Sequence, residues 1–383
     1  MTPGKPAGEK PASRSKAARL VVVADDLTGA CDAAVAFTRV SDSVCVRIDG
    51  DLAGDAEITG VSTESRDLPE DEAERRVCDL IERLPADVEL FKKVDSVLRG
   101  NTYAEVRAAL RCAQYDLAVV APAYPGLGRR MREGVMQIQD AAGDCTIPVA
   151  EMLSRYGCRP SPIGAGLSRE EIEQEMKAAL ERSTNVVLCD AWEEHDLTHT
   201  VQAARSLGVR FLWIGSGGLA HALAPEFGDS HPGTFSKCSG DVLFFIGSDH
   251  PVTQAQLAKL QDEGHAVGCR QVITAGSDHL LLRVVRGQTS REEIRRSLAG
   301  RSPATIGCLF ITGGDTASLV CDALGIRALR MVREFSPGVP VAVAEGGPWE
   351  GVTVVLKSGG FGEERLLCHL LEEFGGKSEV AVS

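Results

Sequence analysis

Two adjacent carboxylates follow a short apolar stretch near the start of the chain. Residues 20–24 read LVVVA, and Asp25 and Asp26 come directly after them. Such a run is typical of a strand buried on both faces, and residues 28–37 have the spacing of a helix. Either acid alone could simply cap that helix. Two acids in one turn repel each other, and capping cannot explain both of them. In an open α/β sheet this turn is where ligands bind.

A second stretch gathers hydrogen-bond donors around one acid. Residues 89–101 read ELFKKVDSVLRGN, in which apolar residues flank Lys93, Asp95 and Arg99. A charge run exposed to solvent would normally lack those apolar neighbours, so we favour a functional role. Arg66 follows another predicted strand, residues 57–63, and is either exposed surface or part of the same site.

Three turns rich in glycine or serine follow strands in the second half of the chain. They read GSD at 247–249, TGGDT at 312–316 and SGGFG at 358–362. Turns of this kind direct backbone N–H groups and a helix N-terminus towards a ligand, which suits phosphate. Three of them predict a nucleotide site. GxxxxGK[ST] does not occur, so the chain is not a P-loop enzyme and Lys357 is not a P-loop lysine.

The elements that position these residues alternate between strand and helix patterns. We therefore predict an α/β fold with two domains, each a largely parallel sheet flanked by helices, and an active site in the cleft between them. A polar, Gly- and Pro-rich segment marks the boundary. The predicted parts are a disordered leader at 1–19, a first domain at 20–225, a linker at 226–240 and a second domain at 241–383.

Composition narrows the class of protein. The chain has 383 residues, 44% hydrophobic and 25% charged, which is ordinary for a globular protein with sizeable cores. The net charge of -13 argues against a nucleic-acid or anionic-membrane partner. No stretch has the roughly 18 apolar residues that span a bilayer. The 12 cysteines form no CxxC pair and read mostly as buried thiols, so we expect a reducing, cytoplasmic setting.

Two other motifs are weaker. Residues 215–220, GSGGLA, match a dinucleotide-binding pattern, but no acid follows about 20 residues later at the end of a second strand. A dinucleotide-dependent oxidoreductase is therefore a minor alternative. His195 and His199 have helical spacing but lack the glutamate of HExxH, so we predict no metal site made by the protein alone.

Several separated motifs give the chain a family resemblance. VVVADDLTGACDAA, STESR, FKKVDSVLRGN and APAYPGLGR in the first part, and GSDHPVTQAQ, ITGGDTA, PGVP and LKSGGFG in the second, resemble the four-carbon acid sugar kinases in motif order. The resemblance covers Leu20 to about Leu371. It implies a sugar-acid-binding first domain and a nucleotide-binding second domain. The implied activity is ATP-dependent phosphorylation of the terminal hydroxyl of threonate, erythronate or 3-oxo-tetronate, with Mg²⁺ accompanying ATP.

The resemblance also implies site residues. We expect Asp26 or Asp95 to accept the hydroxyl proton, and Arg66 and Lys93 to bind the carboxylate of the sugar acid. The segment between Ser248 and Gly313 is shorter than in the family, which leaves a non-catalytic nucleotide or metabolite sensor as an alternative. The oligomeric state stays open, a homo-oligomer included. The implied substrate contacts are Asp25, Asp26, Arg66, Lys93, Val94, Asp95 and Ser96, and the implied ATP contacts are Ser248, Gly313, Gly314, Asp315, Thr316, Gly359 and Gly360.

Overall fold

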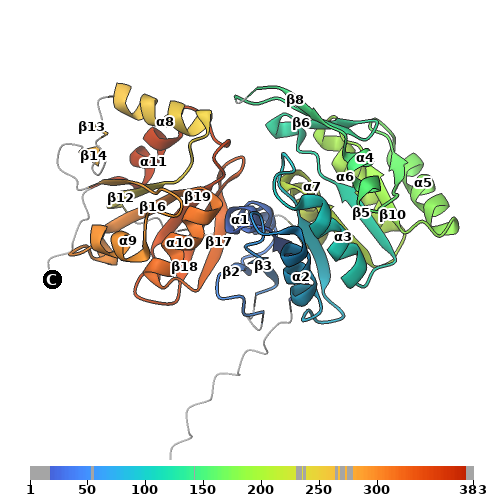
Figure 1. The fold of residues 1–383 in the computed structure, drawn as a ribbon, viewed down its shortest axis with the longest axis horizontal. Coiled ribbons are helices and arrows are strands. Elements are labelled where there is room, and N and C mark those ends of the chain that lie inside the picture. The colour runs from blue at the N-terminus through green and yellow to red at the C-terminus, as the bar shows by residue number, and fades with distance from the viewer. Residues whose placement is uncertain are drawn as a thin grey trace, which may run out of the picture.

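One mixed sheet of 14 strands crosses the molecule in the computed structural model (Figure 1). The structure describes residues 18–52, 56–141, 143–229, 235, 239–263, 266–267, 272–273 and 279–376. Most of the predicted leader and of the predicted linker lies outside these residues. The strand order is β15-β12-β16-β19-β18-β17-β2-β3-β1-β4-β11-β5-β10-β9.

The first half contributes eight strands, and every pairing among them is parallel. Helices separate most of them, as the alternating sequence pattern predicts, and a three-stranded antiparallel sheet is inserted after β5. The strands of the main sheet are β1 (Leu20–Ala24), β2 (Val44–Arg47), β3 (Ile58–Ser62), β4 (Glu89–Lys93), β5 (Leu117–Ala121), β9 (Ser161–Ile163), β10 (Val186–Cys189) and β11 (Phe211–Gly215); the inserted sheet is β6 (Arg129–Arg132), β7 (Val135–Ile138) and β8 (Cys145–Ile147). The helices are α1 (Leu27–Ala34), α2 (Glu70–Ile81), α3 (Thr102–Cys112), α4 (Val149–Arg155), α5 (Arg169–Glu181), α6 (Glu194–Ser206) and α7 (Gly217–Leu223).

The second half contributes four parallel strands and an antiparallel pair, β17 and β18. Alternate residues of β12 face two different apolar cores: Val242 and Phe244 pack with α11 on one side, and Leu243 and Phe245 face the core shared with the first half. The strands are β12 (Asp241–Ile246), β13 (Ala266–Val267), β14 (Val272–Ile273), β15 (Leu280–Arg283), β16 (Ile306–Thr312), β17 (Ala328–Ser336), β18 (Val339–Glu345) and β19 (Thr353–Lys357). The helices are α8 (Pro251–Asp262), α9 (Arg291–Ser297), α10 (Gly314–Leu324) and α11 (Leu366–Phe374).

The two halves meet at an antiparallel pairing that the sequence did not reveal. Ala328, Leu329 and Arg330 of β17 pair with β2, so the two sets of strands form one continuous sheet. Helix α1 lies at this seam between the halves (Figure 1), and all eight of its residues are buried. A helix buried all round needs small residues on most faces, which explains its LTGACDAA sequence.

The strand order also fixes where a ligand can bind. β3 and β4 lie on opposite sides of β1, so the chain reverses direction across the sheet there. Such a reversal opens a crevice beyond the carboxyl ends of the strands. In the second half, β12, β16 and β19 are neighbours, and each precedes one of the three glycine turns.

Two of the cysteines form a disulfide that the sequence did not predict. Cys78 of α2 and Cys112 of α3 form a disulfide, although the sequence predicted mostly free thiols. Their 34-residue separation gave no signal, because only the packing of two helices brings the residues together. Cys45, Cys189 and Cys308 are free and buried, as expected. No helix among the described residues has the length and apolar character to cross a membrane.

Candidate functional site

Arg66 resolves the repulsion between the two adjacent carboxylates. Its Nε donates to Asp25 Oδ2 at 2.7 Å and its Nη2 donates to Asp25 Oδ1 at 2.9 Å, while Nη1 donates to Asp26 Oδ2. Both carboxylates are at most 4% exposed. β1 and β3 are neighbouring parallel strands, which is why acids after one and the arginine after the other meet.

β4 brings the second predicted cluster to the same edge of the sheet. Asp95 Oδ1 lies 3.5 Å from Arg66 Nη2, and both oxygens of Asp95 accept hydrogen bonds from Arg99, at 2.6 and 2.9 Å. Lys93 Nζ lies 3.4 Å from Asp32 Oδ2 and donates to the Val94 carbonyl. The predicted substrate contacts therefore form one buried network of charges, with Ser96 also buried beside it.

The two candidate bases have opposite environments. Burial raises the pKa of Asp26, and Asp25 adds to the shift, although Arg66 opposes it. Burial would also raise the pKa of Asp95, but hydrogen bonds and charge from Arg99, helped by Arg66, hold that pKa well below its usual range. A carboxylate whose pKa is raised is the better proton acceptor, so the surroundings favour Asp26.

Asp26 is also the N-cap of α1. Its Oδ1 accepts a hydrogen bond from the Gly29 N–H at 2.6 Å, and its Oδ2 accepts one from the Thr28 hydroxyl at 3.0 Å. The capping alternative therefore holds for Asp26, while Asp25 pairs with Arg66. These contacts fix the orientation of the carboxylate.

The three glycine turns of the second half converge on one another and on Asp26. A Cβ atom at Gly247 would overlap Thr316, and one at Gly359 would overlap Ser248. A Cβ atom at Gly314 would overlap the Asp26 carboxylate of the other half. Gly313 has φ 101°, which other residues rarely adopt. Glycine is thus required here for close approach as well as for the turns.

Asp25, Asp26 and Arg66 of the charged group line adjoining cavities that reach the glycine turns, whereas Lys93, Val94, Asp95 and Ser96 line neither cavity. A cavity of about 490 Å³ opens between the halves, and a smaller one of about 110 Å³ adjoins it through Asp26, Arg66 and Asp315. Ser248, Gly359 and Gly360 do not line either cavity and lie beside the larger one. The larger cavity is lined by Asp26, Arg66, Asp67, Gly247, Val284, Arg286, Gly287, Thr289, Gly313, Gly314, Asp315, Thr316 and Leu319.

The structure adds residues that the sequence did not point to. Arg286 and Asp67 line the cleft and form an ion pair with each other across it. Ser318 of α10 donates to Glu64 of the first half at 2.9 Å. An arginine or acid in a surface turn looks like any solvated residue in the sequence, so only the fold assigns these to the cleft.

Lys357 supports the third glycine turn through hydrogen bonds to the backbone of that turn. Its Nζ donates to the carbonyls of Gly359 and Phe361 and to the Thr253 hydroxyl, at 2.9 to 3.1 Å. Burial lowers its pKa to about 7. This lysine supports the turn through the backbone, which fits the expectation that it is not a P-loop lysine.

The GSGGLA motif serves packing. A Cβ atom at Gly218 would lie 2.6 Å from the Ala123 carbonyl, and one at Gly215 would lie 2.6 Å from the Ala121 carbonyl. Gly215 ends β11 beside β5, and Gly218 lets α7 approach the segment after β5 closely. The close packing gives the motif a structural reason that needs no dinucleotide.

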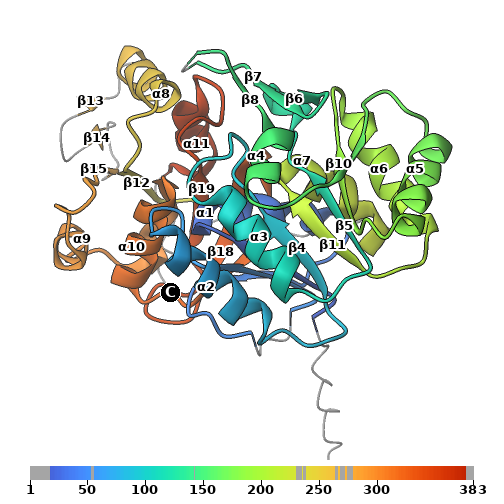
Figure 2. The same ribbon diagram turned by 45° about the vertical axis from the view of Figure 1, so that its right-hand side comes forward.

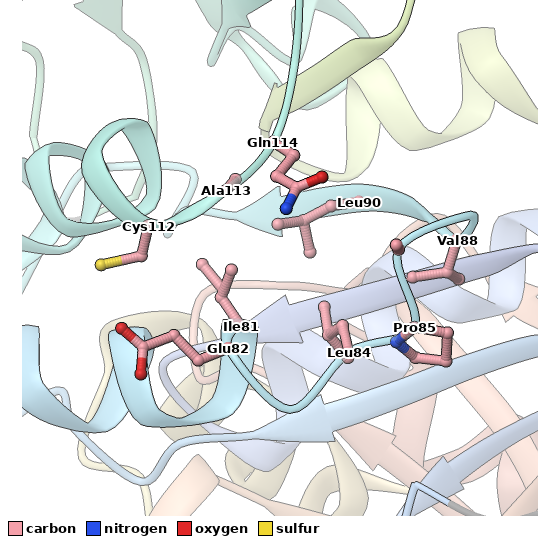
Figure 3. A pocket seen from close by; sticks show the side chains of 10 residues that line it. Ile81, Glu82, Leu84, Pro85, Val88, Leu90, Cys112, Ala113 and Gln114 are labelled. Carbon is pink, nitrogen blue, oxygen red and sulfur yellow. The ribbon is translucent and has the colours of Figure 1, made fainter.

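Another cavity lies away from the predicted site (Figure 3). It measures about 230 Å³ and is lined by Ile81, Leu84, Val88, Leu90 and Cys112 among others. Leu90 is near the amino end of β4, whereas Lys93 is at its carboxyl end. The cavity therefore opens at the opposite edge of the sheet, and no predicted site residue lines it.

Comparison with known families matches both halves of the chain. Residues 20–223 match a sugar-binding N-terminal domain, and residues 291–367 match a nucleotide-binding C-terminal domain. The first match covers the charged network, and the second covers two of the glycine turns.

Relatives align over nearly the whole chain. A D-threonate kinase of Bordetella bronchiseptica is 33% identical, with 90% of this chain and 95% of the relative covered. A D-threonate kinase of Salmonella typhimurium is 27% identical, with 92% and 97% covered. The crystal structure of a Haemophilus influenzae protein has the same fold, with a TM-score of 0.65 at 18% identity, covering 92% of this chain and all of that one.

Proposed function

The chain belongs to the four-carbon acid sugar kinase family, and from this premise we propose that it phosphorylates the terminal hydroxyl of a four-carbon sugar acid with ATP. The observation that carries the proposal is the shared cleft. Asp26 and Arg66 of one half line the same cavity as Gly247, Gly313 and Thr316 of the other. A kinase needs acceptor and donor sites that open onto each other.

D-threonate is the first substrate to test, because the relatives named above are D-threonate kinases. D-erythronate and 3-oxo-tetronate remain candidates, because stereochemistry is decided by small differences in side-chain position. We propose that Arg66 and Lys93 hold the carboxylate of the sugar acid. A guanidinium has five N–H donors, and the two acids beside Arg66 use three of them.

The glycine turns fit the phosphates of ATP. A Cβ atom would overlap other residues at Gly247, Gly314 and Gly359, and α10 begins at Gly314 with its N-terminus towards the cleft. Exposed backbone N–H groups and the helix dipole favour a bound anion there. The cavity volume of about 490 Å³ lies within the range of known ligand pockets. We propose that Ser248, the turn of residues 313–316, Gly359 and Gly360 contact ATP.

The chemistry required of the protein is small. Asp26 accepts the proton of the terminal hydroxyl, whose oxygen forms a bond to the γ-phosphorus of ATP. The bond between that phosphorus and the bridging oxygen breaks, and its electron pair leaves with ADP. General bases of this kind contribute about 10² to 10⁴ in rate. The N-cap and the Arg66 contact hold Asp26 in place for this role.

Magnesium fits the same cleft. Mg²⁺ prefers oxygen ligands and is usually held by one or two carboxylates together with phosphates. Asp26, Asp67 and Asp315 line the cavity. We propose that Asp315 binds the Mg²⁺ that accompanies ATP and offsets phosphate charge, because Asp26 is the proposed base and Asp67 belongs to the sugar-acid half.

A substrate panel tests the proposal. The protein is incubated with ATP, Mg²⁺ and each of the three sugar acids, and release of ADP is followed in a coupled assay. We expect turnover with at least one acid and only background release without acid. Absence of phosphorylated product from every acid, in a protein whose melting temperature rises with ATP, would instead favour the sensor alternative.

A further inference from the structure

A second arginine faces the cleft, and it comes from the nucleotide half. Arg286 lies in the turn after β15 and lines both cavities of the cleft between the halves. Its Nη2 lies 3.0 Å from Asp67 Oδ2 of the sugar-acid half, and its Nε lies 2.9 Å from Asp315 Oδ2 of the second glycine turn. The side chain is 67% exposed. Arg286 thus links the two halves at the mouth of the cleft.

Three other cations near the cleft have partners within the protein, and two of them are proposed above to hold the sugar acid. Arg66 is surrounded by Asp25, Asp26 and Asp95. Lys93 is buried against Asp32, and Lys357 points into backbone carbonyls. Three acids and two arginines line the larger cavity, so a triphosphate would enter a cleft whose own lining is net negative.

Arg286 is the cation that can move at little cost. Its two ion pairs are exposed, and such pairs contribute little to stability because water and salt screen them. Its backbone is fixed nonetheless: Thr289 Oγ1 accepts from the Val285 N–H at 2.9 Å, the Thr289 N–H donates to the Val285 carbonyl at 2.9 Å, and Gly287 has φ 70°. A rigid turn therefore presents a long, solvent-exposed side chain beside Gly313 and Gly314.

We propose that Arg286 is a catalytic residue that exchanges Asp67 and Asp315 for the γ-phosphate of ATP when the cleft is filled. This proposal rests on the proposed kinase function. There the guanidinium stabilises the charge of the phosphoryl group during transfer. When ATP is not bound, the same side chain links the two halves through Asp67 and Asp315. Their carboxylate oxygens accept hydrogen bonds as phosphate oxygens do.

The first test measures nucleotide binding without turnover. The affinities of wild type, Arg286→Ala and Arg291→Ala for a non-hydrolysable ATP analogue and for ADP are compared by calorimetry, with Mg²⁺ present. Arg291 is the matched control, because it is similarly exposed and its ion pair among the described residues is with Asp322. We expect Arg286→Ala to bind the ATP analogue roughly 10-fold more weakly, as one lost charged contact implies, with ADP affinity nearly unchanged. Arg291→Ala should match wild type for both ligands.

The second test measures turnover on the best sugar acid. An arginine that stabilises a transferred phosphoryl group is worth roughly 10³- to 10⁵-fold in kcat in other enzymes. We expect a loss of at least roughly 10²-fold in Arg286→Ala, partial rescue by Arg286→Lys, and a nearly unchanged KM for the sugar acid. Asp67→Asn removes the link between the halves but keeps the cation, so it should lose far less kcat.

Each outcome decides the proposal. Equal losses in Asp67→Asn and Arg286→Ala would mean that Arg286 acts only as a link, which overturns the proposal. Wild-type turnover combined with an Arg286→Ala variant that behaves like Arg291→Ala would overturn it too, and would leave the kinase function standing. If wild type phosphorylates none of the acids, the proposed function fails. The calorimetry then decides alone: a selective loss of ATP-analogue affinity supports the phosphate contact, and equal affinities overturn it.

Discussion

The two halves build their sides of the cleft by different means. The first half uses charged side chains: Asp25, Asp26, Arg66, Lys93 and Asp95 form a buried network at the ends of three adjacent strands. The second half uses backbone and empty space, because Gly247, Gly314 and Gly359 lie so close to other residues that a Cβ atom there would overlap them. Figure 2 shows α1 and α10 next to each other at the junction between the two constructions.

This difference separates two kinds of recognition. Buried charges are costly unless they are paired and hydrogen-bonded, so the side chains of the charged half are held in fixed positions. Such a half is suited to a small anion that is recognised through contacts to its individual atoms. Backbone N–H groups and a helix terminus recognise phosphate without regard to the rest of the ligand. Substitutions in the first half should therefore change chemistry and acceptor choice, and those in the second should change nucleotide affinity.

The largest effect is expected from Asp26→Asn. Loss of a general base should lower kcat by roughly 10² to 10⁴, while asparagine keeps the N-cap of α1 and hence the fold. Because the pKa of Asp26 is raised, wild-type kcat/KM should fall as the pH drops through that pKa. Coupled ADP release over a pH series measures both. Asp95→Asn is the companion variant: a normal rate in Asp26→Asn with none in Asp95→Asn would reverse the two roles.

Arg66→Lys should have the next largest effect. A lysine cannot reproduce the two-pronged contact with Asp25 or offset both carboxylates. Charged hydrogen bonds contribute about 1.5 to 3 kcal/mol, so KM for the sugar acid should rise by roughly 10- to 150-fold. Steady-state kinetics with varied sugar acid provide the measurement. Arg75→Lys on the exposed face of α2 is the control and should leave KM unchanged; a matching rise there would show a general effect of the exchange.

Gly359→Ala tests the other half. A methyl group at this position overlaps Ser248, and overpacking of this kind costs typically about 1 to 3 kcal/mol. Nucleotide affinity should fall by up to that amount, while KM for the sugar acid changes little. Calorimetry with ADP gives the affinity. Gly164→Ala, where no atom lies within 4 Å of the added carbon, should behave as wild type. Unchanged ADP binding in Gly359→Ala would remove this turn from the nucleotide site.

The smallest expected effect concerns stability and Lys357. Burial lowers its pKa to about 7, whereas an unfolded lysine titrates near 10.4. Between these values the unfolded state binds more protons, so the free energy of unfolding should rise with pH, by at most about 1.4 kcal/mol per pH unit from this group. Urea unfolding at pH 7 and pH 9 tests this. Lys357→Met should lose that rise and Lys177→Met should keep it; the same rise in wild type and Lys357→Met would refute the assignment.

Much of the fold could be predicted from the sequence, because the patterns that indicate its strands, helices and turns are local. The apolar run at 20–24 became β1, and the three glycine turns sit between strand and helix as predicted. The charged cluster at residues 89–101 could be predicted for the same reason, because Lys93 and Asp95 lie among apolar neighbours. Its grouping with Arg66 came only from the family resemblance, because the residues alone left Arg66 as either exposed surface or part of the same site.

The missed features all depend on contacts between distant parts of the chain. The pairing of β17 with β2 joins residues 328–330 to residues 45–47, and no local pattern marks either strand as a partner for the other. The Cys78–Cys112 disulfide needs two packed helices. Arg286 looks like an ordinary surface arginine until β15 is placed beside β12, at the mouth of the cleft.

Transfer of the labelled γ-phosphate from ATP to D-threonate, followed in parallel with ADP release, tests the shared cleft most directly. If the charged half holds the acceptor and the glycine turns hold the donor, labelled phosphothreonate and ADP should form in equal amounts with wild type, and both should form roughly 10²- to 10⁴-fold more slowly with Asp26→Asn. If ADP and free labelled phosphate accumulate instead, with no label on D-threonate, D-erythronate or 3-oxo-tetronate, the two sites do not act together and the proposed function is wrong.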